Sequence, residues 1–449
     1  MLGPYHAPTP EDPDERIAVP AWIDHAIWWQ VYPLGFAGAD DVLDADQSQA
    51  THGLQRLVGW LDHLVELGGN GLLLGPLFTS MSHGYDTLDY FTVDPRLGTN
   101  DDLQRLITEA KRRGIRVVLD GVFNHVGRDF PKAQEAISGG PDSEAGRWLK
   151  WSEGSDGKDY PYTFEGHEQL VTLNHDEPAV QQFVGDVLRH WLGQGVDGWR
   201  LDAAYAVPAE FWAAVVPGVR EQFGDAWLVG EMIHGDYAAY AGEAGLDSIT
   251  QYELWSAIWS SVEHANFFEL DWTLGRHRLL LESLVPMTFL SNHDTSRVAS
   301  QIADPRHLPH AVVLLGFLPG VPSIYYGDDF GLRAVKENRA GGDDAVRPEL
   351  PPERGLYAGG DSAIEQLYRD LIGLRRRTPW LVDAEIRTEQ VANQHIRIVA
   401  TPRSGGDTPL TLTLNLADAS YALPAGATVV ASGALERNRV APHSWAITS

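Results

Sequence analysis

The chain of 449 residues contains no cysteine. This absence excludes disulfide bonds, thiolate metal sites and cysteine nucleophiles. Long apolar runs are also missing, and none reaches the ~18 residues that a membrane-spanning helix needs. The first residues, MLGPYHAPTPEDPDER, lack the basic and apolar regions of a secretory signal. Together these absences predict a cytoplasmic protein.

Basic residues are scarce relative to acidic ones. Lys and Arg number 34 against 62 Asp and Glu, which gives a net charge of −28 and a pI near 4.9. Such a surface repels phosphate backbones and anionic lipids, so nucleic acid and membranes are not expected as partners. An uncharged ligand is unaffected by this field. Hydrophobic residues at 43% and charged residues at 21% are typical of a globular protein.

Eight short apolar runs, rich in β-branched or aromatic residues, recur along the chain. They are AIWWQVYP (26–33), GLLLGP (71–76), RVVLDGV (116–122), VDGWRLD (196–202), WLVGE (227–231), SITQY (248–252), MTFLSN (287–292) and PSIYYGD (322–328). Each is bounded by Gly, Pro or Asp, which is typical of strands that are buried on both faces.

Segments with helical periodicity separate these runs. The clearest, NDDLQRLITEAKRRG (100–114), opens with Asn and two acids and ends in a basic turn and Gly114. Its apolar residues share one face: Leu103, Leu106, Ile107 and Ala110. Eight strands alternating with helices predict an α/β protein with a (β/α)8 barrel of the TIM type. A doubly wound open sheet is the alternative, but the chain lacks the Gly-rich phosphate loop that would favour it.

Two stretches interrupt the alternation of strands and helices. Residues 126–177, after the third strand, are rich in Gly, Asp and aromatics and predict a small inserted domain. From about residue 383 the apolar pattern changes to a period of two with turns, which predicts an antiparallel β domain over 383–449. The barrel is accordingly predicted to comprise residues 1–125 and 178–382.

Polar residues stand where the predicted strands end, which is where TIM barrels carry their working groups. They are Asp120, Asn124 and His125 on the third strand, Arg200 and Asp202 on the fourth, Glu231 on the fifth, and Asn292, His293 and Asp294 on the seventh. A structural salt bridge would explain any one carboxylate, but not a coincidence at four strand ends. A metal cluster is a further alternative, although no two histidines have ligand spacing on one element and Arg200 would compete with a cation.

Several segments together resemble a known family. DGVFNH (120–125), GWRLDAA (198–204), VGEM (229–232) and FLSNHD (289–294) resemble, in order, the four best-known motifs of the α-amylase family of glycoside hydrolases. LVTLN (170–174) resembles the fifth motif. HGYDTLDYFTVDPRLGT (83–99) and GVPSIYYGDD (320–329) also resemble family segments. The resemblance covers roughly residues 26–380.

The resemblance implies a retaining mechanism with three carboxylates. Asp202 matches the nucleophile and Glu231 the proton donor, two groups that lie ~5–5.5 Å apart in retaining glycosidases. Asp294 matches the third family carboxylate, which grips ring hydroxyls as the sugar distorts toward an oxocarbenium ion. Arg200 is expected to hold Asp202 ionised, because a nearby cation lowers the pKa of a carboxylate.

The resemblance also implies a substrate-binding shell. Its members are Tyr85, Asp120, His125, Arg200, His293, Asp343 and Arg347. Tyr85 matches an aromatic platform, since a flat ring complements the apolar face of a sugar. His125 and His293 match the histidines of the subsite before the scissile bond. Asp343 and Arg347, four residues apart in GGDDAVRP, are a further pair in that subsite.

No cofactor is required by this chemistry, whereas a structural calcium is left open. Asn124 matches a calcium ligand of the family and is the candidate metal ligand of this chain. SDGKD (155–159) is the nearby acid–glycine loop and would equally form a simple turn. The oligomeric state is not indicated by the sequence.

Two departures from family patterns narrow the expected substrate. Many endo-acting amylases carry Lys-His shortly after the nucleophile, where this chain has DAAYAVP (202–208). Exo-acting α-glucosidases often have Asp three residues before the platform tyrosine, where Ser82 stands. With these two departures, the sequence resembles the cyclomaltodextrinase and neopullulanase branch of the family. This resemblance implies an oligosaccharide substrate, namely short linear or cyclic maltodextrins cleaved at α-1,4 and also α-1,6 bonds.

Two other functions stay open as alternatives. The same covalent intermediate could pass to a sugar, giving a transglycosylase or a glucosyl isomerase, because water and sugar acceptors differ only in loop shape. A non-catalytic sugar-binding barrel belongs to a different class of function. It is disfavoured because the three catalytic carboxylates are all present.

Overall fold

The computed structural model describes residues 16–39, 52–339, 341–423, 428–431 and 438–449. Its largest sheet has eight parallel strands in the order β12-β11-β10-β5-β2-β1-β14-β13. Along the chain these are β1 (Trp28–Val31), β2 (Gly71–Leu74), β5 (Arg116–Val122), β10 (Gly198–Asp202), β11 (Trp227–Gly230), β12 (Ser248–Ile249), β13 (Met287–Phe289) and β14 (Val321–Tyr325). Seven lie within the apolar runs and β14 begins one residue before its run, so all eight predicted strands are confirmed.

The sheet closes on itself between its two edge strands. Thr250, directly after β12, forms a parallel bridge with Met287 of β13, and the Gln251 amide donates to the Met287 carbonyl oxygen at 2.9 Å. The predicted (β/α)8 barrel is therefore confirmed, and the alternative of an open doubly wound sheet is wrong. Because β12 is two residues long, this seam of the barrel is held by few hydrogen bonds.

Helices surround the barrel. They are α1 (Pro33–Ala37), α2 (Gly53–Leu67), α3 (Asn100–Arg112), α5 (Pro178–Gly193), α6 (Ala209–Arg220), α7 (Tyr237–Ala244), α8 (Tyr252–Glu263), α9 (Phe267–Leu280), α10 (Val298–Gln301), α11 (Leu308–Phe317) and α12 (Ser362–Arg377). α3 begins at a capping box between Thr99 and Asp102, and the four apolar residues predicted to share its inner face are all buried. Within the described ranges, no helix is long and apolar enough to cross a membrane.

Side chains alternate along each barrel strand, so every second residue points into the barrel. At the lower level Trp28 stacks on Trp227 with ring centroids 5.2 Å apart, in a buried cluster that includes Val118. Gly71 is required beside them, because a Cβ atom there would lie 2.3 Å from the Trp28 indole. Two residues after Val118 stands the buried Asp120, so the interior changes from apolar to polar toward the C-terminal ends of the strands.

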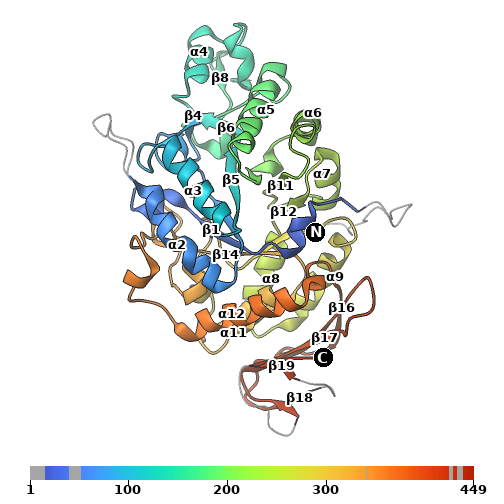
Figure 1. The fold of residues 1–449 in the computed structure, drawn as a ribbon. Coiled ribbons are helices and arrows are strands. Elements are labelled where there is room, and N and C mark those ends of the chain that lie inside the picture. Colours follow the sequence, from blue (N-terminus) through green and yellow to red (C-terminus); the bar gives the residue numbers. More distant parts are fainter. Residues whose placement is uncertain (1–15, 40–51, 340, 424–427, 432–437) are drawn as a thin grey trace.

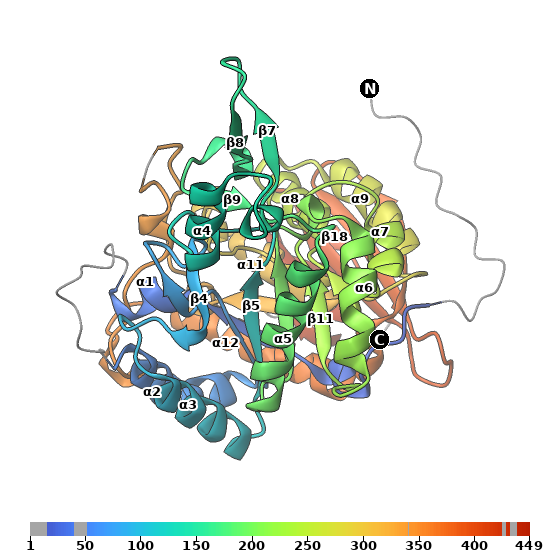
Figure 2. The same ribbon diagram turned by 90° about the horizontal axis from the view of Figure 1, so that it is seen from above.

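Between β5 and α5 the chain forms a small lobe. It contains α4 (Pro131–Gly139) and two short antiparallel pairs, β6 (His125–Gly127) with β9 (Leu170–Thr172) and β7 (Trp151–Glu153) with β8 (Asp159–Pro161). Figure 1 shows this lobe at one end of the barrel, and Figure 2 shows the β7–β8 hairpin projecting from it. The exact domain limits, 126–177 for the insertion and 383 for the C-terminal domain, stay predictions.

A second sheet follows the barrel and is antiparallel, as predicted. Its order is β15-β16-β17-β21-β19, with β15 (Glu385–Val391), β16 (His395–Thr401), β17 (Leu410–Asn415), β19 (Thr428–Ala431) and β21 (Ser444–Thr448); β18 (Tyr421–Ala422) pairs with β20 (Arg439–Val440). Residues 424–427 and 432–437 of this predicted domain, like 1–15 and 40–51 of the predicted barrel, lie outside the described residues. In Figure 1 the sheet lies at the end of the molecule opposite the inserted lobe.

A buried histidine supports the base of the barrel between α9 and the seam. His277 is fully buried; its Nε2 lies 3.0 Å from the Pro319 carbonyl oxygen and its Nδ1 lies 3.4 Å from the Gln251 amide nitrogen. Since a carbonyl accepts and an amide NH2 donates, the ring is neutral with its proton on Nε2. Burial lowers the pKa of His277 to about 4.

This histidine makes folding pH-dependent in a defined direction. Its pKa in the folded state lies below the ordinary value of about 6.5, so the unfolded chain takes up the proton first and stability is lost as pH falls from about 6.5 toward 4. Each pH unit in that window costs about 1.4 kcal/mol. We therefore expect the thermal unfolding midpoint of His277→Gln to rise relative to that of the wild type as the pH is lowered from 7 to 5.

The matched control is His264→Gln, the same change at an exposed histidine. The difference between this control and the wild type should stay constant over the same pH range. A pH-independent difference for His277→Gln would show that His277 keeps an ordinary pKa in the folded protein.

Candidate active site

One guanidinium joins three carboxylates at the mouth of the barrel. Arg200 of β10 contacts Asp120 of β5 at 2.5 Å, Asp202 at 3.2 Å and Glu231, which directly follows β11, at 2.5 Å. All four side chains are buried. The strand register explains the arrangement, because Arg200 lies level with Asp120 on one neighbouring strand and with Val229 on the other. The polar strand ends predicted from the sequence therefore meet at one point.

The backbone after β10 ties Asp202 to Glu231. Ala203 has a left-handed conformation with φ 45° and ψ 37°, which is costly for a residue with a Cβ atom. This turn aims the Ala203 N–H at Glu231, which accepts it on Oε2 at 3.0 Å. Strained backbone of this kind concentrates at functional sites, where the surrounding structure holds it in place.

Arg200 lowers the pKa of Asp202, as expected, but other influences on this carboxyl outweigh it. Burial and the neighbouring charge of Glu231 raise the pKa of Asp202 well above its usual range, and the attraction of Arg200 is too weak to reverse this. The reason is that Arg200 divides its charge among three carboxylates and lies nearer to Asp120 and Glu231 than to Asp202. Asp202 and Glu231 therefore resist being ionised together.

Tyr252 is a member of the site that the sequence reasoning missed. Its hydroxyl donates to Oε1 of Glu231 at 3.1 Å and accepts from Nδ2 of Asn292 at 2.7 Å. Together with the Ala203 N–H and Arg200, it gives both oxygens of Glu231 a fixed hydrogen-bonding partner. Tyr252 ends the sixth predicted strand, so its position at a strand end was the available signal, but an aromatic residue there is also typical of core packing.

A second group of contacts surrounds Asp294, which follows β13. His293 lies 3.0 Å from Asp294, and Arg347 lies 3.1 Å from Asp294 and 3.2 Å from Asp343. The predicted pairing of Asp343 with Arg347 is therefore present. Lys336 also contacts Asp343, at 3.0 Å. Burial raises the pKa of Asp294, but His293 and Arg347 outweigh it and hold the pKa well below the usual range, so Asp294 is ionised.

Tyr85 connects the two groups of carboxylates. It lies in the loop between β3 (Phe78–Ser80) and β4 (Thr87–Val93), and its hydroxyl donates to Asp120 at 3.2 Å and hydrogen-bonds to Nε2 of His293. The His293 ring is stacked between Tyr85 and Tyr32, with centroids 5.3 Å and 5.9 Å away and planes within 8°. Tyr32, at the end of the first predicted strand, is a second residue that sequence reasoning missed.

His125 borders the same loop from the inserted lobe. Its Nε2 donates to the Tyr85 carbonyl oxygen at 3.1 Å, and its ring stacks on Phe164 with centroids 4.6 Å apart. Burial lowers the pKa of His125 to about 3, so the ring is neutral. Phe164, which belongs to the lobe, is the third residue not predicted. All ten residues predicted for catalysis and substrate binding thus lie in one connected network, while their individual roles stay predictions.

The predicted calcium ligand Asn124 lies beside this network. It is buried, and its Nδ2 contacts Nδ1 of His125 at 3.1 Å. Among the residues that the structure describes, no set of three His, Asp or Glu ligand atoms converges around Asn124. The SDGKD segment forms the turn of the β7–β8 hairpin, where Asp156 accepts from Tyr160. Calcium would have to rely on amide and backbone oxygens here, and we derive no role for it.

Comparisons with known proteins agree with this geometry. Residues 30–397 match the family described as "Alpha amylase, catalytic domain". The chain is 33% identical to a cyclomaltodextrinase of Bacillus sp. over 85% of its length and 72% of the relative. It is 30% identical to neopullulanase 2 of Thermoactinomyces vulgaris over 88% of its length and 72% of that relative.

A solved structure extends the likeness over nearly the whole chain. Cyclic α-maltosyl-(1→6)-maltose hydrolase from Arthrobacter globiformis, in complex with cyclic α-maltosyl-(1→6)-maltose, has a TM-score of 0.79 and 26% identity, and covers 96% of this chain and 99% of its own. Fold, family match and relatives agree. The chain belongs to the α-amylase family and is a glycoside hydrolase.

Proposed function

We propose that the protein cleaves α-glucosidic bonds in short linear or cyclic maltodextrins by a retaining double displacement. The observation that carries the proposal is the meeting of Asp202 and Glu231 on the Arg200 guanidinium at the barrel mouth. Two carboxyls on neighbouring strands supply the nucleophile and the acid–base group that a retaining glycosidase needs. We propose α-1,4 bonds as the main linkage and α-1,6 bonds as a second one.

In the first step Asp202 attacks the anomeric carbon of the sugar. The glycosidic C–O bond breaks as Glu231 donates its proton to the leaving oxygen, which forms a glycosyl ester on Asp202. The contacts of Tyr252 and the Ala203 N–H orient the Glu231 carboxyl for this transfer. Asp294 is ionised and partly exposed, so it can accept hydrogen bonds from ring hydroxyls and stabilise the oxocarbenium-like transition state.

In the second step water takes the place of the leaving group. Glu231 accepts a proton from the water as its oxygen attacks the anomeric carbon, and the ester bond to Asp202 breaks. The sugar leaves with its original anomeric configuration, and both carboxyls return to their starting states. These steps use side chains and water alone. A calcium at Asn124 and a cytoplasmic location stay predictions.

The protonation state of the carboxyl pair suits this sequence of steps. Burial and the charge of Glu231 raise the pKa of Asp202, so this carboxyl holds a proton more readily than an ordinary aspartate. One proton on the pair is what the first step requires, with the proton on Glu231 and the charge on Asp202. A glycosidic oxygen that accepts from Glu231 favours that distribution.

Two observations support short or cyclic maltodextrins as substrates. Residues 202–208 read DAAYAVP, so the Lys-His of many endo-acting amylases is missing after Asp202. The printed names of the relatives are cyclomaltodextrinase, neopullulanase and cyclic α-maltosyl-(1→6)-maltose hydrolase. The names cyclomaltodextrinase and cyclic α-maltosyl-(1→6)-maltose hydrolase both refer to cyclic substrates, and the second includes a 1→6 bond.

Removing the nucleophile should stop turnover and spare binding. We expect Asp202→Asn to lose at least about 10³-fold in kcat on maltotetraose, because an amide cannot form the glycosyl ester, while the affinity for maltotetraose stays within a few-fold. Asp156→Asn, the same change in the hairpin turn of the inserted lobe, should behave as the wild type. Unchanged turnover in Asp202→Asn would end the mechanism.

Removing the charge of Glu231 should make Asp202 easier to ionise. With α-glucosyl fluoride, whose leaving group departs without protonation, Glu231→Gln still forms the ester. The acid limb of kcat/KM then reports the ionisation of Asp202. We expect this limb to move to lower pH than in the wild type, because the amide no longer raises the pKa of Asp202. Glu135→Gln on α4 is the matched control, and its acid limb should coincide with that of the wild type. An unchanged acid limb in Glu231→Gln would contradict the effect of the Glu231 charge on the pKa of Asp202.

A substrate panel tests linkage and outcome. Linear, branched and cyclic maltodextrins, trehalose and sucrose are incubated with the wild type, and the products are separated by chromatography. We expect cleavage of cyclic and short linear maltodextrins to smaller sugars and no action on trehalose or sucrose. Longer or rearranged glycosides formed from pure maltotetraose would instead identify a transglycosylase or isomerase that uses the same intermediate.

A further inference from the structure

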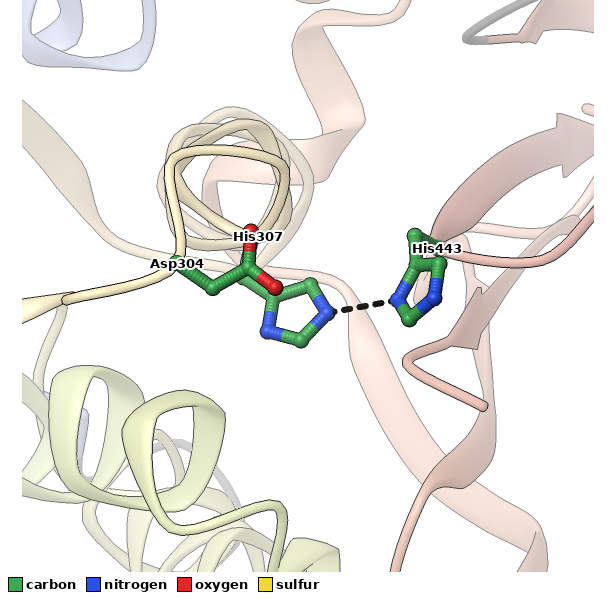
Figure 3. A group of neighbouring side chains, drawn as sticks. All are labelled: Asp304, His307 and His443. Carbon is green, nitrogen blue, oxygen red and sulfur yellow. Dashed lines mark hydrogen bonds between the residues drawn. The ribbon is translucent and has the colours of Figure 1, made fainter. Parts of the chain in front are cut away.

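Three side chains with metal-binding atoms meet where the barrel contacts the C-terminal sheet. Asp304 and His307 lie just before α11, and His443 lies just before β21, 136 residues further along the chain. One ligand atom from each lies within 4.8 Å of the other two, the one such group among the described residues. Figure 3 shows the two imidazole rings facing each other beside the carboxylate. We call these three residues the junction cluster.

The two imidazoles are already near the spacing of metal ligands. Nε2 of His307 lies 2.9 Å from Nδ1 of His443. Two nitrogens bound tetrahedrally to zinc at ~2.0–2.1 Å would lie ~3.3 Å apart. The two nitrogens would therefore have to separate by about 0.4 Å, and the rings would have to turn so that both lone pairs point at the ion. Both are half-buried and held by the fold, and His443 has a left-handed backbone with φ 50° that sets the direction of its ring.

A carboxylate behind His443 fixes its tautomer. Nε2 of His443 lies 2.9 Å from Asp418, and because a carboxylate accepts, the proton of the ring is on Nε2 and the lone pair is on Nδ1. That lone pair faces His307. Histidines that bind metals are commonly held in this way, with the second nitrogen donating to a carboxylate. The hydrogen between the two rings is carried by Nε2 of His307. When a metal ion takes its place, the proton of His307 would move to Nδ1.

The charges around the junction cluster favour a cation. Asp418 accepts a hydrogen bond from His443, and Asp304 lies beside His307. Glu263 accepts from the backbone N–H of Ala303 at 2.7 Å. The opposing charge is Arg306, which donates hydrogen bonds to both carboxylate oxygens of Asp304 at 2.6–3.1 Å. Each carboxylate oxygen has two lone pairs, so this grip fixes the orientation of Asp304 and leaves it able to accept a further ligand.

We propose that the junction cluster binds a divalent transition-metal ion, with zinc the best match, and that the ion fastens the C-terminal sheet to the barrel. Imidazole nitrogens suit zinc and its neighbours, whereas calcium and magnesium prefer oxygen ligands throughout. Three protein ligands leave a fourth position for water. His310 on α11 already contacts carbonyl oxygens of Asn415 and Ser444 at 3.2 Å, so the ion would reinforce an existing contact. This site is separate from the barrel mouth and does not depend on the proposed function.

The test measures zinc binding by the full-length chain. Protein freed of metal with a chelator is titrated with Zn²⁺ in competition with a chromophoric chelator. We expect the wild type to bind one Zn²⁺ that His443→Asn does not bind; asparagine is chosen because it tolerates left-handed backbone. Asp418→Asn, which keeps all three ligands, should bind about 10–100-fold more weakly. His25→Gln, a change at an exposed histidine of the barrel base, should bind as the wild type.

Thermal unfolding supplies a second readout. Zn²⁺ should raise the unfolding midpoint of the wild type and of His25→Gln, but not that of His443→Asn, since a ligand stabilises only the state that binds it. In chelator, His443→Asn should unfold near the wild-type midpoint, which shows that its fold is intact. The proposal is wrong if the wild type and His443→Asn bind Zn²⁺ equally, or if neither binds it.

Discussion

The position of a single buried guanidinium organises the catalytic end of this barrel. Arg200 lies at the mouth of the barrel and contacts Asp120, Asp202 and Glu231 at once. Three buried carboxylates without it would repel one another and pay a large desolvation cost. One positive charge cannot, however, neutralise all three acids. Burial and the charge of Glu231 raise the pKa of Asp202 despite Arg200, and the chemistry we propose requires one proton on the Asp202–Glu231 pair.

Much of the barrel could be predicted from the sequence because its signals are local. Strands buried on both faces leave short apolar runs ended by Gly, Pro or Asp, and all eight runs are strands. The polar residues at their ends stand out for the same reason, since Asp120, Arg200 and Glu231 interrupt otherwise apolar segments. Parallel strands in a closed barrel bring such residues together, whereas Tyr85, Asp343 and Arg347 lie in loops and were predicted from the family resemblance.

What could not be predicted depends on contacts between distant segments. Tyr32, Phe164 and Tyr252 are aromatic residues among many, and sequence spacing does not distinguish a ring in the site from one in the core. The net pKa of Asp202 could not be predicted either, because the spacing of Arg200 indicates an ion pair but neither the burial of Asp202 nor the nearby charge of Glu231. The meeting of His307 with His443 is likewise invisible until the C-terminal sheet is placed against α11.

The short strand β12 links the integrity of the barrel to its activity. The residues that close the seam, Thr250 and Gln251, are followed directly by Tyr252, which donates to Glu231. Thr250 also accepts from the backbone N–H of Met232, the residue after Glu231. Local opening of this one seam would free Glu231 from its contact with Tyr252 while the other strand pairs stay formed. The closure of the barrel and the hydrogen bonding of Glu231 therefore depend on the same few residues.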